Sequence, residues 1–454
     1  MRQDWRNGKL TKTVIEETDS IKRELDDRDL GFTLEPKPLT QKEFKILILS
    51  NAPHCPSGYG VQTRGMIPDW NKTYDARVLC NWGIQSAKLG LNGIIHYPTL
   101  PGDEHADRTA ELLFRNIKPD VFVTLYDIWM GAYVRPDASR PSGMRAMHPR
   151  WIPIVMVDHD PVPEATLLNA REAYRVVVPT QFAVDQFKKF GVPTTKIPFG
   201  MDTKKFAPNT EEEKKKLKNL LGKRSIVFNL ENNTEIDEDK FVIMICGANK
   251  DPYRKAFTRM FLALQIFLQN NPDAAKDTRV YVHSWMKQAR DIPHGAKTLY
   301  VDQFCRGTAD FHNLCGIPDT VMSNIYGAAD VFLHLSQGGG FEVPILEAMS
   351  KGIPVIGSDF VGMTELIKGH GWLVPPKTKY FTVLDALQCI ADEFKAAEAL
   401  EDAYNHPRKR EKFGKAGREF AINFDWSKIN PLWHNLFEEI REEMRYKPLE
   451  ARKL

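Results

Sequence analysis

Three consecutive glycines, Gly338, Gly339 and Gly340, follow the apolar run Val331–Leu335. The apolar run predicts a buried strand. Glycines lack a Cβ and so let the backbone come close to a ligand. Pro344 is typical of the first turn of a helix. The pattern therefore predicts a strand, a glycine loop and a helix whose N-terminus faces the loop.

The start of this helix is expected to seat a diphosphate, because unpaired N–H groups and the helix dipole both attract anions. Glu347 lies about one turn into the helix and can accept hydrogen bonds from a vicinal diol such as a ribose. Gly352 fits the end of the helix. These residues outline a nucleotide-sugar pocket.

A second strand-to-helix turn carries two cations. The apolar run Phe241–Cys246 predicts a strand, and Arg254 and Lys255 follow it. A leaving nucleoside diphosphate gains negative charge in the transition state, so fixed cations stabilise it selectively. The alternative is that Arg254 and Lys255 are solvated surface residues.

Polar and glycine residues also follow predicted strands in the first half. Gly58 and Gly60 come after the first strand, but Thr63 replaces the third glycine of a dinucleotide-binding fingerprint, which disfavours a dehydrogenase. His159 and Asp127 stand at strand ends, where open α/β sheets bind ligands. A simple turn at the glycines and a structural hydrogen-bond role for His159 are the alternatives.

The segment 336–356 resembles the donor site of retaining GT-B glycosyltransferases, specifically glycosyltransferase family 4 (glycosyl transferases group 1). The family pattern is Glu-Gly-Phe-Gly-x-Pro-x-x-Glu-Ala-Met, followed by Gly-x-Pro-Val. The matching residues are Phe341, Pro344, Glu347, Ala348, Met349, Gly352, Pro354 and Val355. The family's first glutamate corresponds to Gly339, and Glu342 stands where the family has a glycine.

The resemblance implies roles for the matching residues. In the family the first glutamate contacts the transferred sugar and the second holds the ribose, so we hypothesise that Glu342 takes over from the residue missing at 339. His159 is expected close to the donor sugar. The implied catalytic residues are His159, Arg254, Lys255 and Glu342; the donor-binding residues are Gly58, Gly60, Asn249, Gly338, Gly339, Gly340, Phe341, Val343 and Glu347; Asp127 is a weaker candidate for the acceptor.

The length of 454 residues predicts two domains with extensions. Two series of apolar strands alternate with helices, which predicts an α/β chain with parallel sheets. We expect the GT-B arrangement, two Rossmann-like doubly wound domains facing across a cleft. The expected parts are a polar extension at 1–43, an acceptor domain at 44–208, a linker at 209–240, a donor domain at 241–424 and a returning C-terminal helix at 425–454.

Composition excludes few partners. The net charge of +3 predicts no strong polyanion binding, although the basic stretch 408–418 fits either a solvated helix face or contact with an anionic surface. The chain has no transmembrane run and no hydrophobic signal core. Its six scattered cysteines lack Cys-x-x-Cys spacing, which favours reduced thiols, no metal ligation and a cytoplasmic enzyme.

The sequence thus predicts a glycosyltransferase that uses a nucleoside-diphosphate sugar and needs no cofactor, and the resemblance implies retention of anomeric configuration. No obvious Asp-x-Asp clamp for Mg²⁺ stands out, which favours a metal-independent reaction. A non-catalytic nucleotide-sugar-binding protein and a GT-B epimerase or phosphorylase are the alternatives. The acceptor stays open among a glycan, a lipid-linked sugar, a protein and a modified nucleobase.

Overall fold

The first sheet is built from six strands. The computed structural model describes residues 43–103, 105–128, 150–224, 239–247, 253–284, 300–301 and 317–446. The strands are β1 (Lys45–Asn51), β2 (Asp75–Trp82), β3 (Leu89–Leu91), β4 (Ile94–Pro98), β5 (Val121–Thr124) and β6 (Trp151–Pro153). Their order is β3-β4-β2-β1-β5-β6, and every pair except β3 with β4 is parallel.

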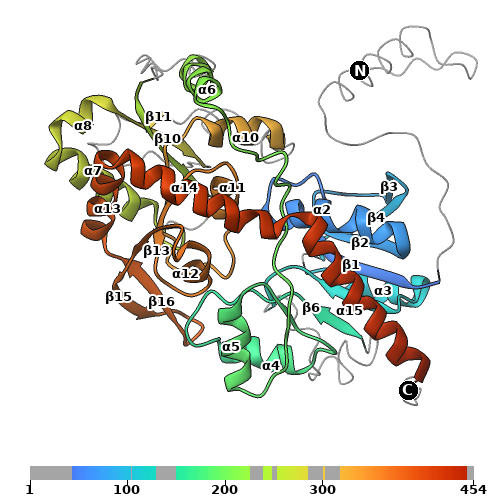
Figure 1. The fold of residues 1–454 in the computed structure, drawn as a ribbon. Helices are drawn as coiled ribbons and strands as arrows, with labels where there is room; N and C mark the ends of the chain where they lie inside the picture. The colour runs from blue at the N-terminus through green and yellow to red at the C-terminus, as the bar shows by residue number, and fades with distance from the viewer. Residues whose placement is uncertain are drawn as a thin grey trace, which may run out of the picture.

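The second sheet is parallel throughout, with the order β11-β10-β9-β12-β13-β14. Its strands are β9 (Phe241–Cys246), β10 (Thr278–His283), β11 (Tyr300–Val301), β12 (Val331–His334), β13 (Val355–Ser358) and β14 (Gly371–Val374). The two sheets form separate α/β units (Figure 1). The predicted fold class, two doubly wound units with parallel sheets, is confirmed.

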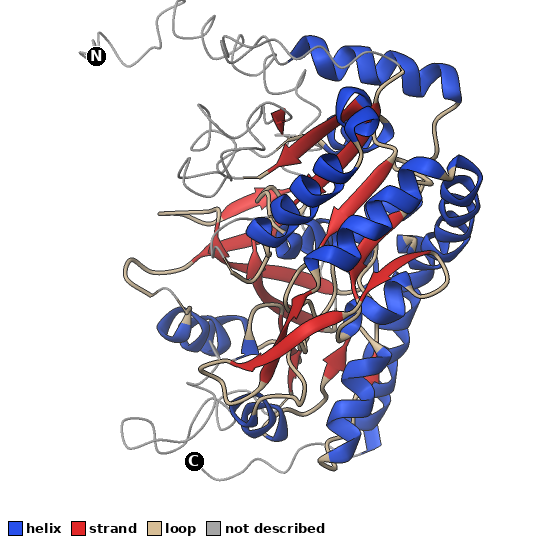
Figure 2. Ribbon diagram, turned by 90° about the vertical axis from the view of Figure 1, so that its left-hand side faces the viewer, coloured by secondary structure: helices blue, strands red, loops and turns tan. Residues whose placement is uncertain are grey.

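Helices cover both sheets, as Figure 2 shows. In the first unit they are α2 (Gly58–Thr73), α3 (Asp107–Ile117), α4 (Glu164–Arg171) and α5 (Gln181–Lys189). In the second they are α7 (Phe257–Asn270), α8 (Pro272–Asp277), α10 (Asp319–Gly327), α11 (Val343–Ser350), α12 (Gly362–Ile367), α13 (Glu393–Asn405) and α14 (Pro407–Ala421). Buried central strands such as β1 and β9 explain why their sequences are almost continuously apolar.

Some elements were not predicted. The strand β8 (Thr195–Lys196) was not predicted; it pairs in parallel with β7 (Val177–Val178), which lies in an apolar run that does predict a strand. The antiparallel edge strand β3 was not predicted either. An antiparallel hairpin, β15 (Pro376–Phe381) with β16 (Leu387–Ala391), follows β14. β6 ends at Pro153 although the apolar run continues to Val157, and Ile154 makes only an isolated bridge to Val177.

The last helix, α15 (Trp426–Tyr446), packs on the first unit (Figure 1). The Tyr74 hydroxyl donates to Glu438 at 2.9 Å, and His434 Nε2 lies 2.8 Å from Asp69. The Trp433 ring lies 5.0 Å from that of Trp70, centroid to centroid. A buried aromatic cluster therefore anchors the C-terminal segment beside β1 and β2.

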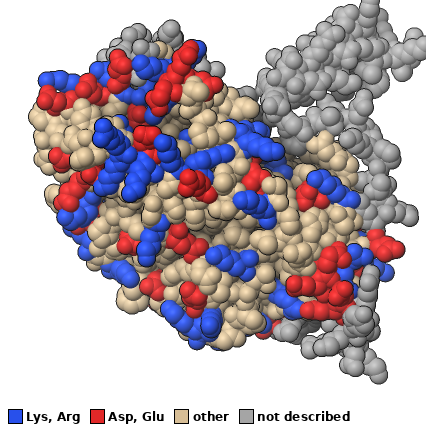
Figure 3. Space-filling view, in the orientation of Figure 1, with Lys and Arg blue, Asp and Glu red and all other residues tan. Residues whose placement is uncertain are grey.

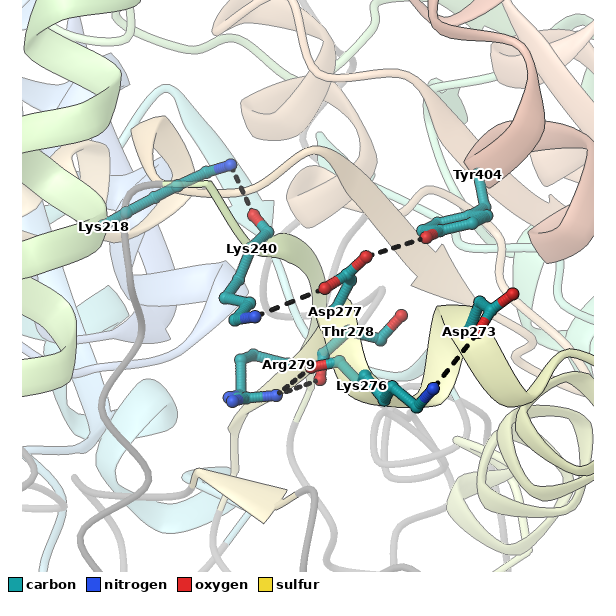
Figure 4. Close-up of polar contacts among 8 residues, drawn as sticks. All are labelled: Lys218, Lys240, Asp273, Lys276, Asp277, Thr278, Arg279 and Tyr404. Carbon is teal, nitrogen blue, oxygen red and sulfur yellow. Dashed lines mark hydrogen bonds and ion pairs between the residues drawn. The ribbon is translucent and has the colours of Figure 1, made fainter.

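Helix α6 (Glu211–Arg224) lies within the predicted linker and binds the second unit through charge. Lys214 and Lys218 approach the buried Asp330 carboxylate at 2.7 and 2.8 Å, and the Val242 amide donates to it at 2.7 Å. Figure 4 shows that Lys218 also donates to the Lys240 carbonyl oxygen at 2.7 Å. The two lysines outweigh the effect of burial and lower the pKa of Asp330.

Removing the Asp330 carboxylate should destabilise this junction strongly. Asp330→Ala leaves Lys218 buried without its partner, so we expect a loss of about 3–5 kcal/mol. The midpoint of urea unfolding measures the loss. The matched control is Glu212→Ala, which breaks the exposed Glu212–Lys216 pair and should cost less than about 1 kcal/mol. Equal shifts in the two variants would contradict this account.

None of the helices in the described part of the chain is long and apolar enough to cross a membrane.

Candidate functional site

The candidate residues lie after the carboxyl ends of parallel strands in both sheets. The loops after β1, β5 and β6 carry Gly58, Asp127 and His159, and the segments after β9 and β12 carry Lys255 and Glu342. Carboxyl ends of parallel strands are the usual ligand-binding edge of such sheets. The two edges meet: the Asp160 amide and carbonyl exchange hydrogen bonds with Leu387 at 3.0 and 3.2 Å.

The strand–loop–helix predicted around the glycines is present. β12 ends at His334, α11 begins at Val343 with Pro344 in its first turn, and Gly352 has a positive φ of 74° just after the helix. Glu342 is the residue at the N-cap, and its side chain does not cap the helix. The first amides of α11 thus lack a side-chain cap from Glu342, as an anion seat requires.

The structure shows that glycine is required in this loop by packing within the protein, and not only by close approach to a ligand. A Cβ on Gly338 would lie 2.3 Å from the Asp158 carbonyl oxygen, and one on Gly340 would lie 2.8 Å from the Val157 nitrogen. Both glycines are therefore needed where the loop packs against the first unit. A Cβ on Gly339 would lie 2.6 Å from Oε1 of Glu342, whose side chain fills that space.

Glu342 forms a buried ion pair with Lys255. Lys255 Nζ lies 2.5 and 2.7 Å from the two carboxylate oxygens. His334 Nε2 lies 3.4 Å from Glu342 Oε2, and both residues are buried. Burial alone would raise the pKa of Glu342, but Lys255 and His334 outweigh it and hold that pKa well below its usual range. The carboxylate is therefore ionised at neutral pH.

The turn that carries Arg254 and Lys255 is tied to the glycine loop. The Arg254 carbonyl oxygen accepts hydrogen bonds from the Gln337 amide at 2.8 Å and from Ser336 Oγ at 3.1 Å. These bonds fix the backbone of the turn, and Lys255 Nζ lies beside Glu342 at the start of α11 rather than on open surface. Asn249, the third predicted residue of this turn, lies outside the described residues.

Glu347 is half-buried on α11, and burial raises its pKa to about 7. The hydroxyl of Tyr326, a fully buried residue, opposes this effect, and Asp319 adds to it. A carboxyl group that titrates near neutrality can still accept from a diol once it is ionised. The protonation state of Glu347 therefore changes with pH around neutrality.

Nucleotide affinity should therefore rise with pH. Below pH 7 the Glu347 carboxyl is protonated and loses an acceptor site, whereas above pH 7 it is ionised. We expect roughly tenfold tighter binding of UDP or GDP at pH 8 than at pH 6, measured by calorimetry. Glu347→Gln is the control, since it removes this titration and leaves that of the nucleotide itself. An equal pH dependence in the variant would contradict the role of Glu347.

The first turn of α2, which follows β1, brings an unpredicted residue to the site. A Cβ on Gly60 would lie 2.4 Å from the Cys55 carbonyl oxygen, so this glycine is needed by the turn, whereas a Cβ on Gly58 would meet nothing within 4 Å. The Tyr59 hydroxyl donates to Asp127 Oδ1 at 2.8 Å. Burial, and beyond it the charge of Asp158, raise the pKa of Asp127.

The loop 158–160 joins both units. His159 is buried, and its Nδ1 lies 2.7 Å from Asp158 Oδ1. Asp160 accepts from Gln186 at 3.2 Å and lies 3.6 Å from Lys379 of the hairpin. Asp158 and Asp160 do have the Asp-x-Asp spacing, which our sequence analysis did not weigh, and these contacts occupy their carboxylates. Among the described residues no cluster of three or more His, Cys, Asp or Glu could hold a metal ion.

Two residues predicted to bind the donor pack into the core. The Phe341 ring lies 5.2 Å from Phe199 and 6.0 Å from Phe424, between ring centroids. Val343 is buried in the same apolar cluster. Their side chains anchor the glycine loop to both units, so any donor contact would come from their backbone.

A carboxylate from the second unit caps a helix of the first. The Glu365 oxygens accept from the amides of Gln181 and Phe182, both at 3.0 Å, at the start of α5. Gln181 is 184 residues from Glu365 in the sequence, so the local sequence around Glu365 does not predict this contact.

The basic stretch 408–418 lies on α14. Figure 3 shows basic side chains mixed with acidic ones over this helix. Lys409 pairs with Asp402 at 2.5 Å, Lys415 pairs with Glu411 at 2.7 Å, and Arg418 donates to the carbonyl oxygens of Thr203 and Ser350, both at 2.9 Å. Much of the stretch is thus engaged within the protein, which favours the solvated helix face over an anionic surface as its partner.

Comparison with known proteins bears on this arrangement. Residues 240–392, which hold the glycine loop, Lys255, Glu342 and Glu347, match the family described as glycosyl transferases group 1. Over these residues the chain is similar to the glycosyl transferases group 1 family. This group 1 unit contains the whole of the predicted diphosphate seat.

Curated relatives match parts of the chain. It is 34% identical over 77 residues to O-antigen chain mannosyltransferase B of Escherichia coli, covering 17% of this chain and 20% of that protein. It is 24% identical over 282 residues to a GDP-mannose-dependent monoacylated alpha-(1-6)-phosphatidylinositol monomannoside mannosyltransferase of Corynebacterium glutamicum, covering 59% and 61%. The chain thus spans between a fifth and about three fifths of these relatives.

The whole arrangement is similar to a solved structure. HepE of Anabaena in complex with UDP and glucose matches with a TM-score of 0.61 and 15% identity, over 87% of this chain and 100% of that chain. At this identity the likeness concerns the fold. The chain therefore has the GT-B fold, as the sequence predicted.

Proposed function

We propose that this protein is a glycosyltransferase that moves a sugar from a nucleoside-diphosphate sugar to an acceptor hydroxyl, with retention of anomeric configuration. The observation that carries the proposal is the group 1 unit with a cationic turn against the glycine loop, where Lys255 Nζ lies 2.5 Å from Glu342. Its relatives include a GDP-mannose-dependent enzyme, and the fold neighbour binds UDP.

The residues present would divide the work. In the reaction the bond between the anomeric carbon and the phosphate oxygen breaks, and its electron pair goes to the diphosphate. The acceptor oxygen bonds to that carbon on the same face, and its proton passes to a leaving phosphate oxygen. Lys255, Arg254 and the amides of α11 would stabilise the charge on the diphosphate. Glu347 would hold the ribose.

The sugar would lie between the two units. We assign Glu342 to its hydroxyls, since this carboxylate lies at the start of α11 and is ionised. His159, at the edge of the first unit, would donate to the sugar, and Asp127 with Tyr59 would face the acceptor. We place the reaction in the cytoplasm, because the buried residues Cys55, Cys80 and Cys389 form no disulfide within the described part of the chain.

Release of free nucleotide from a panel of UDP-, GDP- and ADP-sugars tests this proposal. We expect slow hydrolysis of one donor, lost in Glu347→Ala and unchanged by EDTA. Binding of a nucleotide without release, under any acceptor offered, would favour the non-catalytic binding protein. Conversion of the donor sugar without release would favour an epimerase, and a product of inverted configuration would overturn retention.

A further inference from the structure

His334 combines burial with a lack of hydrogen bonds. It is the last residue of β12, only 1% exposed, directly before the loop that holds the glycines. Within the described part of the chain neither of its ring nitrogens has a hydrogen-bond partner. Most buried polar groups are bonded, and an exception calls for an explanation.

The ring of His334 is held in place. It stacks on the Phe332 ring of the same strand, with centroids 5.7 Å apart and planes 14° apart. Residues two apart in a strand face the same side, so this stacking fixes the direction of the imidazole. Nε2 then lies 3.4 Å from Glu342 Oε2, beyond the usual limit of about 3.2 Å for a hydrogen bond.

Glu342 is occupied by Lys255 in this state. The lysine reaches both carboxylate oxygens, at 2.5 and 2.7 Å. The same lysine lies beside the start of α11, where the donor diphosphate is proposed to bind. A diphosphate carries more charge than one carboxylate, so it attracts Lys255 more strongly. If Lys255 turned to the diphosphate, Glu342 would remain buried and ionised without a partner.

We propose that His334 is a positioning residue that binds the Glu342 carboxylate when Lys255 transfers to the donor diphosphate. This inference rests on the proposed function, because it needs a diphosphate at this seat. Closing a gap of a few tenths of an ångström turns the 3.4 Å contact into a hydrogen bond donated by Nε2. His334 thus keeps Glu342 in place for the sugar while Lys255 is engaged.

Two variants of similar chemistry separate positioning from packing. His334→Gln places an amide nitrogen where Nε2 stands, whereas His334→Asn places one near Nδ1 and cannot reach Glu342. Calorimetry with whichever of UDP, GDP and ADP the unchanged protein binds is the readout. We expect the affinity of His334→Gln for the nucleotide to lie within about threefold of that of the unchanged protein. His334→Asn should bind roughly tenfold more weakly, because in this variant Lys255 would stay paired with Glu342 and could not bind the diphosphate.

The second arm removes the carboxylate. Glu342→Gln frees Lys255, so we expect tighter nucleotide binding, and adding His334→Asn to it should then have no further effect. An equal loss from His334→Asn in both backgrounds, or equal binding by the Gln and Asn variants, would overturn the inference. If the unchanged protein binds none of the three nucleotides, the proposed function itself fails, and this inference fails with it.

Discussion

Exchanging the residues at positions 339 and 342 should preserve donor turnover, although each substitution alone should impair it. The exchange is Gly339→Glu together with Glu342→Gly, which creates the motif of the family that this chain resembles. The Glu342 side chain occupies the space beside residue 339, where a Cβ would lie 2.6 Å from its Oε1. A glutamate at 339 could therefore deliver its carboxylate to the same place.

The single variants fail for different reasons. Gly339→Glu forces a second carboxylate against Glu342, and adjacent like charges oppose ionisation. Glu342→Gly removes the carboxylate and leaves Lys255 buried without its partner. Loss of a hydrogen bond from a charged group to the sugar should lower kcat/KM by roughly 10–100-fold.

Nucleotide release from the preferred donor measures all three variants, and thermal stabilisation by the nucleotide shows whether the pocket is intact. Recovery of turnover in the double variant supports the idea that Glu342 stands in for a glutamate at 339. A double variant as slow as the slower single variant, with nucleotide binding intact, would refute it.

The elements of this site could be predicted because their signals are local. The apolar run before the glycines, Pro344 and Gly352 placed the strand, the loop and the ends of α11 within a few residues. Likewise Glu347 was singled out by its place one turn into that helix. Each of these signals depends on residues within about one turn or one strand of one another.

The contacts that decide the chemistry are not local. Lys255 and Glu342 are 87 residues apart, and neither sequence neighbourhood shows that they pair. His334 lies within the apolar run that predicts β12, so it was treated as part of that strand. The signal that could have singled it out is that it is the one polar residue of the run. Tyr59 and Asp127 are 68 residues apart, and neither local sequence shows that they bond.

The hairpin β15–β16 was missed for a different reason. Pro376 opens β15, and prolines demote a strand prediction, while Lys377 and Lys379 make its outer face polar. Its Tyr380 hydroxyl donates to Gln337 of the glycine loop at 2.5 Å, and Leu387 pairs with Asp160. An element with no strong pattern of its own thus links the loop of His159 to the loop of the donor site.

Replacing Lys255 by methionine should strongly weaken recognition of the diphosphate without affecting recognition of the nucleoside. The Lys255 ammonium lies 2.5 Å from the carboxylate of Glu342, the N-cap residue of α11. It is therefore placed to contact a diphosphate bound at the start of this helix. Its charge acts on phosphates alone, because a nucleoside offers no anion. We expect turnover to fall by about 10²–10³, the usual effect of losing one donor to a developing charge.

The nucleoside serves as the internal control of this experiment. Affinities of Lys255→Met for UDP and uridine, or for GDP and guanosine, are compared with those of the unchanged protein. Because Lys255→Met leaves Glu342 buried without its lysine, the variant should also unfold more easily. Adding Glu342→Gln removes the unpaired buried charge, so the double variant should regain stability. Its affinity for the diphosphate should stay as low as that of Lys255→Met. Equal loss of nucleoside and diphosphate affinity, or recovery of diphosphate binding together with stability, would show that Lys255 serves the fold and not the donor.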